Sequence, residues 1–311
     1  MAAKPDRGRY TSRTNLVART AAQMLLLRPV VWRIVQVNVH GTEHLGNVDG
    51  AFIAVANHSS HLDAALVFGS MPRRLSQNMA TGAAADYFFD KWWKAAPTSL
   101  FFNALPIERG TRARKGMETE QQNPRARRGL AGQLLSDGVP LLIFPEGTRS
   151  RTGAMGPYVP GAAALSISRN VPVIPIALVG AFAAWPYQQS TPPRGRPPVH
   201  VVYGHPMVPQ PGEIAHTFNE RIRRQVIELH DSTATAYGMP TLAEYARTLA
   251  IERARRSGPP AGGAPDAASS GPTGEHEDPA SDPDTSPSES SGGQGPDDAP
   301  RASTHERPSE E

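Results

Sequence analysis

The chain has 311 residues, no cysteine and a formal net charge of +3 at pH 7. The length suffices for one large domain, and the lack of cysteine excludes disulfides and cysteine-ligated zinc. Residues 257–311 carry twelve acids and two arginines, so the preceding residues are strongly basic. A basic domain favours anionic membranes, phosphorylated ligands or nucleic acid. No zinc-finger spacing, RNP-type strand or KH-type loop occurs, so no nucleic-acid partner is expected.

The first 34 residues are predicted to form a basic amphipathic segment. Residues 1–33 contain seven Lys/Arg and one Asp, and Arg28, Pro29 and Arg33 interrupt the most apolar run. This run is too short and too charged to span a bilayer, and it lacks a signal-peptide cleavage site. Such a helix can lie among lipid headgroups. We therefore expect no transmembrane helix, a break at Pro29, and peripheral association with the cytoplasmic face of an anionic membrane.

The next part of the chain, residues 35–256, predicts a single domain of alternating strands and helices. Apolar, β-branched runs predict strands at 34–41, 51–57, 74–80, 104–108, 139–145, 171–180 and 198–204. Helices are predicted at 59–70, 83–95, 124–136, 161–169, 214–230 and 241–256. Several continuous apolar strands indicate a sheet buried on both faces. The expected fold class is α/β, with a mixed sheet of about seven strands flanked by helices.

Two segments have unusual compositions. Residues 86–102 hold seven of the 20 aromatic side chains, interleaved with lysines. Tryptophan and tyrosine favour the membrane interface, although an aromatic mini-core is the alternative. Residues 257–311 contain no large apolar side chain. They cannot bury enough surface to offset the entropy of the chain, which predicts a disordered acidic tail.

Three polar clusters directly follow predicted strands: "NHSSHLD", "ERG" and "PEGTRS". Ligands of open α/β sheets bind outside the carboxyl ends of strands. The first cluster places Asp63 five residues after His58. The same spacing joins His44 to Asp49, but that pair lies in a Gly/Asn-containing turn before a strand, where a solvated loop is the simpler interpretation.

His58 and Asp63 have the residue types of a base and its orienting partner. An aspartate that accepts from one imidazole nitrogen leaves the other free to take a proton. This is part of a hydrolytic triad, but the chain has neither a GxSxG elbow nor a cysteine nucleophile. The pair therefore suits direct attack by a hydroxyl of the substrate. Arg109 and Arg149, in the other two clusters, are candidates for phosphate recognition.

The blocks "NHSSHLD", "FPEGTRS" and "VPVIPIAL", in this order, resemble the glycerolipid acyltransferases, specifically the 1-acyl-sn-glycerol-3-phosphate acyltransferases, over residues 35–210. The resemblance implies that His58 is the catalytic base and Asp63 its partner. It implies that Arg109 binds the acceptor phosphate, although Ala104 stands where the family commonly has glycine. Residues implied to bind and position the acceptor are Glu146, Gly147, Thr148 and Arg149.

The implied reaction moves an acyl group from acyl-CoA or acyl carrier protein to the free hydroxyl of 1-acyl-sn-glycerol-3-phosphate, which gives phosphatidic acid. It needs no metal and no organic cofactor. Another lysolipid or glycolipid acceptor is the alternative within the family. Two rivals lie outside it: a metal-dependent hydrolase with His58, His61 and Asp63 as ligands, and a membrane scaffold without catalytic activity.

Overall fold

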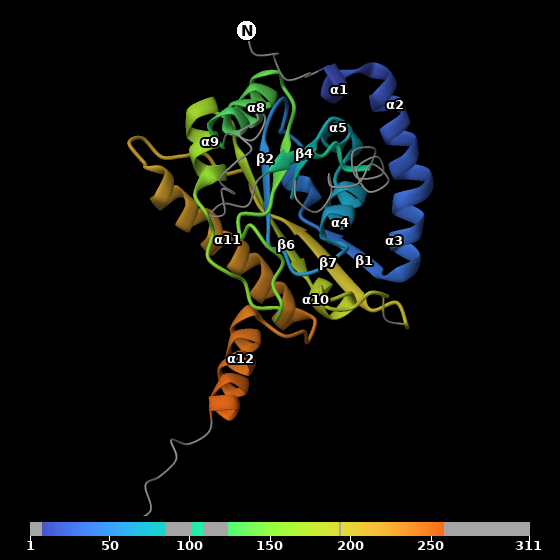
Figure 1. Ribbon diagram of the computed structural model, residues 1–311, viewed down its shortest axis with the longest axis vertical. Coiled ribbons are helices and arrows are strands. Elements are labelled where there is room, and N and C mark those ends of the chain that lie inside the picture. Colours follow the sequence, from blue (N-terminus) through green and yellow to red (C-terminus); the bar gives the residue numbers. More distant parts are fainter. Residues whose placement is uncertain (1–7, 85–100, 108–123, 193, 258–311) are drawn as a thin grey trace, which may run out of the picture. The chain divides into compact units, whose positions relative to one another are not determined.

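The computed structural model describes residues 8–84, 101–107, 124–192 and 194–257 (Figure 1). The strands are β1 (Gln36–His40), β2 (Ile53–Ala56), β3 (Ala80–Ala84), β4 (Leu105–Ile107), β5 (Leu141–Ile143), β6 (Val173–Val179) and β7 (Pro198–Tyr203). Within the described residues they form one seven-stranded sheet in the order β1-β7-β6-β2-β5-β3-β4. All neighbours are parallel except β6 and β7, which are antiparallel. The sheet is therefore mixed.

Helices cover both faces of this sheet. In the N-terminal half they are α1 (Gly8–Thr11), α2 (Arg13–Ala22), the π-helical turn η1 (Gln23–Leu27), α3 (Arg28–Ile34), the 3₁₀ turn η2 (Thr42–Leu45), α4 (Asp63–Ser70) and α5 (Arg73–Ser76). In the C-terminal half they are α8 (Pro124–Ser136), α9 (Gly161–Arg169), α10 (Ala181–Ala184), α11 (Ala215–Ala236) and α12 (Leu242–Ser257). Figure 1 shows α2–α5 on one side of the sheet and α8, α9 and α11 on the other.

The alternation of side chains along β2 explains the two layers of helices. Ala54 and Ala56 join a core cluster with side chains of α3 and α4, whereas Ile53 and Val55 join a cluster with side chains of α8, α9 and α11. Successive residues of a strand point to opposite faces. All four are fully buried, as expected for a central strand of a sheet packed on both sides. The predicted α/β class, with a mixed sheet flanked by helices, is confirmed.

Three local predictions for residues 35–256 differ from the structure. Residues 74–80 are not a strand: after Pro72 the chain forms α5, and β3 begins only at Ala80. The helix predicted from residue 59 begins at Asp63, because the preceding backbone N–H groups bond to the Asp63 carboxylate. Residues 85–95 of the predicted helix 83–95 lie outside the described residues, and residues 83–84 belong to β3.

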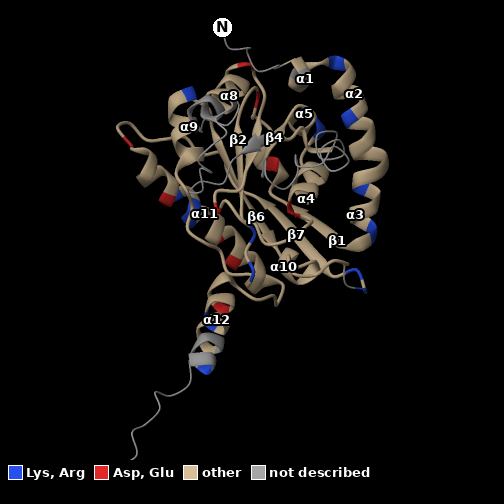
Figure 2. Cartoon of the chain, in the orientation of Figure 1, with Lys and Arg blue, Asp and Glu red and all other residues tan. Residues whose placement is uncertain are grey.

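The predicted break at Pro29 is wrong, because the basic N-terminal segment is helical from Arg13 to Ile34. Proline removes one backbone donor and crowds the preceding turn. The wider π-helical turn η1 lies directly before α3, the helix that contains Pro29. It accommodates the missing donor and the crowding, as π-bulges do in other helices. Figure 2 shows Lys/Arg along α2 and α3, but Arg19 is buried and donates to Asn103 Oδ1 at 2.8 Å. None of the described helices is both long and apolar enough to cross a membrane.

Candidate active site

The carboxyl ends of two neighbouring strands create the candidate site. β2 and β5 run in parallel with Val55 opposite Ile143, so the residues that follow each strand emerge at the same edge of the sheet. Directly after them lie His58 and Phe144, whose rings stack with centroids 4.1 Å apart. The polar clusters "NHSSHLD" and "PEGTRS" are thereby brought together, as the sequence predicts for parallel strands.

His58 and Asp63 form a hydrogen-bonded pair. Nδ1 of His58 lies 2.8 Å from Oδ2 of Asp63, whose side chain is fully buried. The same oxygen accepts the backbone N–H of Ser59 at 2.6 Å and of Ser60 at 2.8 Å. Because the carboxylate faces Nδ1, that nitrogen carries the proton and Nε2 is the nitrogen that can accept one from a ligand. The His58 side chain is 19% exposed, so a bound group can reach it.

Asn57 continues the sheet where β2 ends. Its Nδ2 donates to the carbonyl of Leu178 at 3.1 Å, and its Oδ1 accepts the Leu178 N–H at 2.8 Å. The side-chain amide thus pairs with β6 as a backbone peptide of β2 would. No separate role was predicted for Asn57 from the sequence, although an amide side chain at the end of a buried strand is a usable signal for such a bridge.

Glu146 holds the backbone of the His58 loop. Its Oε1 accepts the His58 N–H at 2.7 Å and its Oε2 accepts the Gly156 N–H at 2.8 Å. Burial raises the pKa of the Glu146 carboxyl from 4.5 to about 7, although both N–H donors act to lower it. Burial likewise raises the pKa of nearby Tyr158 well above its usual value. The structure thus places Glu146 in a supporting position, and its role in binding the acceptor stays a prediction.

The loop after Glu146 turns back toward His58. Gly147 adopts a left-handed conformation (φ 69°), which favours glycine, and its N–H donates to the Phe144 carbonyl at 3.1 Å. Thr148 is exposed. The Ser150 N–H donates to the His58 carbonyl at 2.7 Å. Glu146 and Ser150 therefore fix the loop to both backbone groups of the predicted base.

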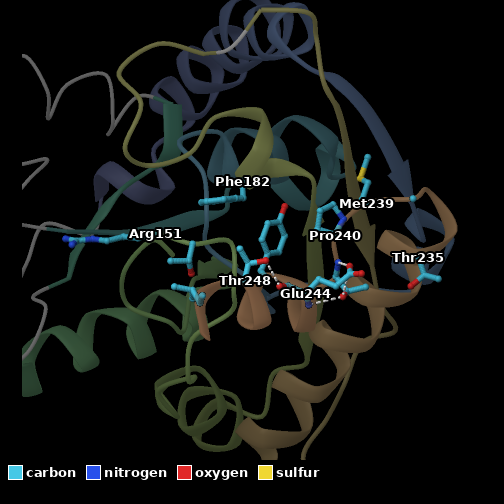
Figure 3. Close-up of a pocket in the computed structure, with 12 residues that line it drawn as sticks. Arg151, Phe182, Thr235, Met239, Pro240, Glu244 and Thr248 are labelled. Carbon is cyan, nitrogen blue, oxygen red and sulfur yellow. Dashed lines mark hydrogen bonds between the residues drawn. The ribbon is translucent and has the colours of Figure 1, made fainter. Parts of the chain in front are cut away.

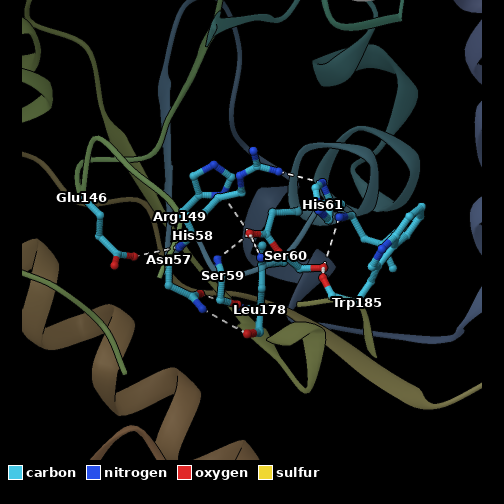
Figure 4. A network of polar contacts seen from close by, with 11 residues as sticks. Asn57, His58, Ser59, Ser60, His61, Glu146, Arg149, Leu178 and Trp185 are labelled. Atoms are coloured by element: carbon cyan, nitrogen blue, oxygen red, sulfur yellow. Dashed lines mark hydrogen bonds and ion pairs between the residues drawn. The ribbon is translucent and has the colours of Figure 1, made fainter. Parts of the chain in front are cut away.

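Arg149 contacts His61 at the open side of the site (Figure 4). Its Nη1 lies 2.7 Å from His61 Nδ1, and its guanidinium lies 4.4 Å from the centroid of the Tyr187 ring. His61 Nε2 lies 3.2 Å from the Tyr187 carbonyl. Burial and then the charge of Arg149 lower the pKa of His61, so the ring is neutral, accepts from Arg149 and donates to Tyr187. Sequence reasoning missed Tyr187, whose segment is distant along the chain.

The remaining sequence predictions fall elsewhere. Arg109, residues 86–100 of the aromatic segment 86–102 and the tail from residue 258 lie outside the described residues, whereas Phe102 of that segment packs against the core. Of the second pair at this spacing, His44 bonds the Tyr203 carbonyl at 2.9 Å and Asp49 lies 3.4 Å from Arg74. In the described part of the chain, no group of three or more His, Asp or Glu side chains is arranged to hold a metal ion.

His58 is oriented by a buried carboxylate and lies at the carboxyl edge of an α/β sheet, and the chain contains no cysteine nucleophile. Enzymes that activate a bound hydroxyl have this arrangement. The family model described as Acyltransferase matches residues 36–179. This segment contains β1 to β6 and both motifs of the site. Residues 36–179 are therefore similar to the acyltransferase family, in agreement with the resemblance stated from the sequence.

Curated relatives carry names from the same family. Over 158 residues the chain is 27% identical to the chloroplastic 1-acyl-sn-glycerol-3-phosphate acyltransferase of Brassica napus. This aligned region covers 50% of this chain and 41% of the relative. Over 145 residues it is 27% identical to a putative 1-acyl-sn-glycerol-3-phosphate acyltransferase of Caenorhabditis elegans. That aligned region covers 47% of this chain and 46% of the relative. The chain thus spans less than half the length of these relatives.

Among solved structures, the chain is similar to the 1-acyl-sn-glycerophosphate acyltransferase from Thermotoga maritima. The sequence identity is 22% and the TM-score is 0.48. The match covers 68% of this chain and 83% of the Thermotoga chain.

Proposed function

We propose that the protein is an O-acyltransferase that moves a fatty acyl group from a thioester to the free hydroxyl of 1-acyl-sn-glycerol-3-phosphate, producing phosphatidic acid. The observation that carries the proposal is the His58–Asp63 pair, with Nδ1 held at 2.8 Å and Nε2 left to meet a substrate. The match of residues 36–179 to the acyltransferase model supports acyl transfer, and the names of the relatives support the acyl acceptor.

The mechanism follows from the orientation of His58. Its Nε2 removes the proton of the acceptor hydroxyl as the oxygen attacks the thioester carbonyl, and Asp63 stabilises the imidazolium that forms. The tetrahedral intermediate then breaks its C–S bond, and the leaving sulfur takes the proton from His58 as a thiol. The products are the new ester and the free thiol of CoA or of acyl carrier protein. No metal and no organic cofactor takes part.

Arg149 supports a phosphate-bearing acceptor. A guanidinium recognises phosphate by paired, charge-assisted hydrogen bonds, and Arg149 sits on the loop that Ser150 ties to His58. Its neighbour His61 is neutral because its pKa is lowered, so it adds neither repulsion toward Arg149 nor a competing positive charge. Arg109 is the second phosphate ligand that we propose on the strength of the sequence motif.

The N-terminal helix supports a substrate that resides in a bilayer. Leu25 is 73% exposed and Val30 is 56% exposed, within a segment that also carries Arg28 and Arg33. Exposed apolar side chains beside cationic ones bind anionic membrane surfaces. We propose that this helix places the protein on the cytoplasmic face of the membrane.

The test is an assay of the full chain with a panel of lyso-acceptors in vesicles, with acyl-CoA or acyl carrier protein as donor and with products identified by mass. We expect phosphatidic acid from 1-acyl-sn-glycerol-3-phosphate, and a rate lower by about 10²–10⁴-fold in His58→Ala. Acylation of another acceptor alone would correct the substrate. No acyl transfer at all, or wild-type rates in His58→Ala, would contradict the function.

A further inference from the structure

A pocket separate from the His58–Asp63 pair lies where α10, the end of α11 and the start of α12 meet the segment after Arg149. Its volume is about 820 Å³, within the roughly 300–1,000 Å³ of typical small-molecule sites. Figure 3 shows Arg151 at one end and Thr235 at the other, with Phe182 and Thr248 between them. The pocket is thus elongated. Arg151 lies at one end of it and is only two residues after Arg149 in the sequence.

The Arg151 end is joined to the active-site loop. Arg151 follows Arg149 by two residues, at most about 7 Å of extended chain, and the intervening Ser150 N–H donates to the His58 carbonyl at 2.7 Å. Gln188 Nε2 donates to the Arg151 carbonyl at 2.5 Å. A ligand that lies in the pocket with one end at Arg151 therefore has that end beside the loop that contacts the backbone of the predicted base.

Two hydroxyls in the pocket are set to accept hydrogen bonds. Thr235 Oγ1 donates to the Asp231 carbonyl at 2.8 Å and Thr248 Oγ1 donates to the Glu244 carbonyl at 3.0 Å. A hydroxyl has one hydrogen, so once it is used inside a helix the oxygen presents only its lone pairs to a ligand. Both side chains are exposed. They therefore suit a ligand that carries N–H donors.

The rest of the lining is apolar or already bonded. Phe182 and Tyr245 form an edge-to-face pair with centroids 5.5 Å apart, and Met239 lines the same pocket. The carboxylate of Glu244 accepts the Thr241 N–H at 2.8 Å, which offsets its charge. Arg151 at the other end offers guanidinium N–H donors. The guanidinium lies 6.0 Å from the centroid of the Tyr187 ring, at the outer end of the pocket, where its N–H groups can donate to a carbonyl.

We propose that this pocket binds the pantetheine arm of the thioester donor, with the sulfur end at Arg151. The arm carries two amides and a gem-dimethyl group. Arg151 donates to the amide carbonyl next to the thiol, Thr248 and Thr235 accept amide N–H groups, and the apolar lining covers the methyl groups. This inference rests on the proposed function, and it names a chemistry that CoA and acyl carrier protein share.

Kinetics with full and shortened donors test the assignment. Thr248→Val keeps the side-chain shape and removes the acceptor oxygen, so we expect KM for acyl-CoA to rise roughly threefold to tenfold. Acyl-N-acetylcysteamine keeps the first amide and lacks the second, so its KM should rise in Thr248→Val and stay constant in Thr235→Val. Arg151→Gln should weaken both donors. KM for the lyso-acceptor should stay constant in each variant.

Both donors should show the Thr248→Val effect because they share the arm, so the two donor sources are distinguished by the wild-type kcat/KM for acyl-CoA and for acyl carrier protein. Thr217→Val and Arg224→Gln, exposed on α11 outside the pocket, are the matched controls. Unchanged donor KM in the Thr248 and Arg151 variants, or a rise in KM for the acceptor instead, would overturn the assignment.

Binding measured without turnover separates this inference from the proposed function. Calorimetry with a thioether analogue of acyl-CoA should show weaker binding to Thr248→Val than to Thr217→Val. If the wild-type protein binds the analogue in this manner but transfers no acyl group, the pantetheine site stands and the reaction is wrong. If acyl transfer occurs but both threonine variants bind the analogue equally, the reaction stands and the pantetheine site is wrong.

Discussion

Glu146 Oε1 accepts the backbone N–H of His58 at 2.7 Å. The glutamate of the "PEGTRS" cluster thereby fixes the main chain of the histidine in the "NHSSHLD" cluster, while its other oxygen holds Gly156 at 2.8 Å. A buried carboxyl in this position is sensitive to pH, because ionisation places a charge in a poorly solvated site.

The folding free energy should reveal this titration. The pKa of Glu146 is raised by burial from 4.5 to about 7. Below the lower value both the folded and unfolded states are protonated, and above the higher value both are ionised. Between them the folded state binds more protons, so stability falls as pH rises. Relative to Glu146→Gln, we expect the wild-type protein to lose about 1–3 kcal/mol over this interval.

Chemical denaturation across that pH range measures the difference. Glu220→Gln, an exposed position on α11, controls for the general effect of removing a carboxylate. If the wild-type and Glu146→Gln profiles run parallel between pH 4.5 and 7, the burial of Glu146 does not control its titration.

Asp63→Asn should reduce turnover without weakening substrate binding. The amide oxygen can still accept the Ser59 and Ser60 N–H groups, which lie 2.6 and 2.8 Å from Oδ2 in the wild type, but it carries no charge to stabilise the His58 imidazolium. We expect kcat to fall by roughly 10²–10⁴-fold, with little change in either KM. Asp49→Asn, at the second site with this spacing, should retain wild-type kcat.

Arg149→Gln should weaken acceptors that carry a phosphate. Loss of a charge-assisted contact is expected to raise KM for 1-acyl-sn-glycerol-3-phosphate roughly tenfold to hundredfold. A neutral monoacylglycerol acceptor should be unaffected, and so should KM for the donor. Arg224→Gln, exposed on α11, is the matched control. Equal effects on charged and neutral acceptors would show that Arg149 positions the loop instead of binding phosphate.

Asn57→Ala should destabilise the fold. The substitution removes both hydrogen bonds to Leu178 and leaves a buried N–H and a buried carbonyl without partners. We expect a loss of about 1–3 kcal/mol in unfolding free energy, measured by urea titration. Asn47→Ala, in an exposed turn, should change stability by less than about 0.5 kcal/mol. Similar values for both variants would remove the argument that Asn57 bridges the two strands.

Leu25→Glu should weaken membrane association. The wild-type side chain is 73% exposed on the N-terminal helix, and the substitution both removes apolar area and adds a charge that anionic lipids repel. Co-sedimentation with anionic vesicles measures the bound fraction, which should fall for Leu25→Glu. The control is Val208→Glu, at a position that is 62% exposed in the segment after β7, and its bound fraction should remain unchanged. Equal loss in both variants would indicate a general charge effect.

Much of the sheet follows from the sequence. Six of the seven predicted strand runs coincide with observed strands, because buried β-branched residues such as Val173 and Ile174 occur in continuous runs, and the seventh, 74–80, shares only Ala80 with β3. The strand prediction at 74–80 failed because its buried apolar residues belong to other elements. Leu75 lies in the short helix α5 and Met79 in the turn after it. Apolar residues in a short segment do not distinguish these two cases.

The pairing of His58 with Asp63 was predicted from spacing and position, but the support around it was not. Contacts of Asn57 with Leu178 and of Arg149 with His61 join residues that are 121 and 88 positions apart. Strand order and register decide such contacts, and one sequence contains no direct signal for either. Pro29 likewise needed the geometry of η1, because a wide turn lets a helix continue past proline.

The Asn57 bridge has a consequence for how the protein loses activity on heating. Loops usually open at lower free-energy cost than the sheet that carries them. Here the residue beside His58 is bonded to β6, the longest of the described strands and one that is buried along its whole length. The predicted base should therefore keep its position until the sheet itself unfolds. Inactivation and global unfolding should share one transition, and amide hydrogen exchange at Leu178 should be as slow as in the core.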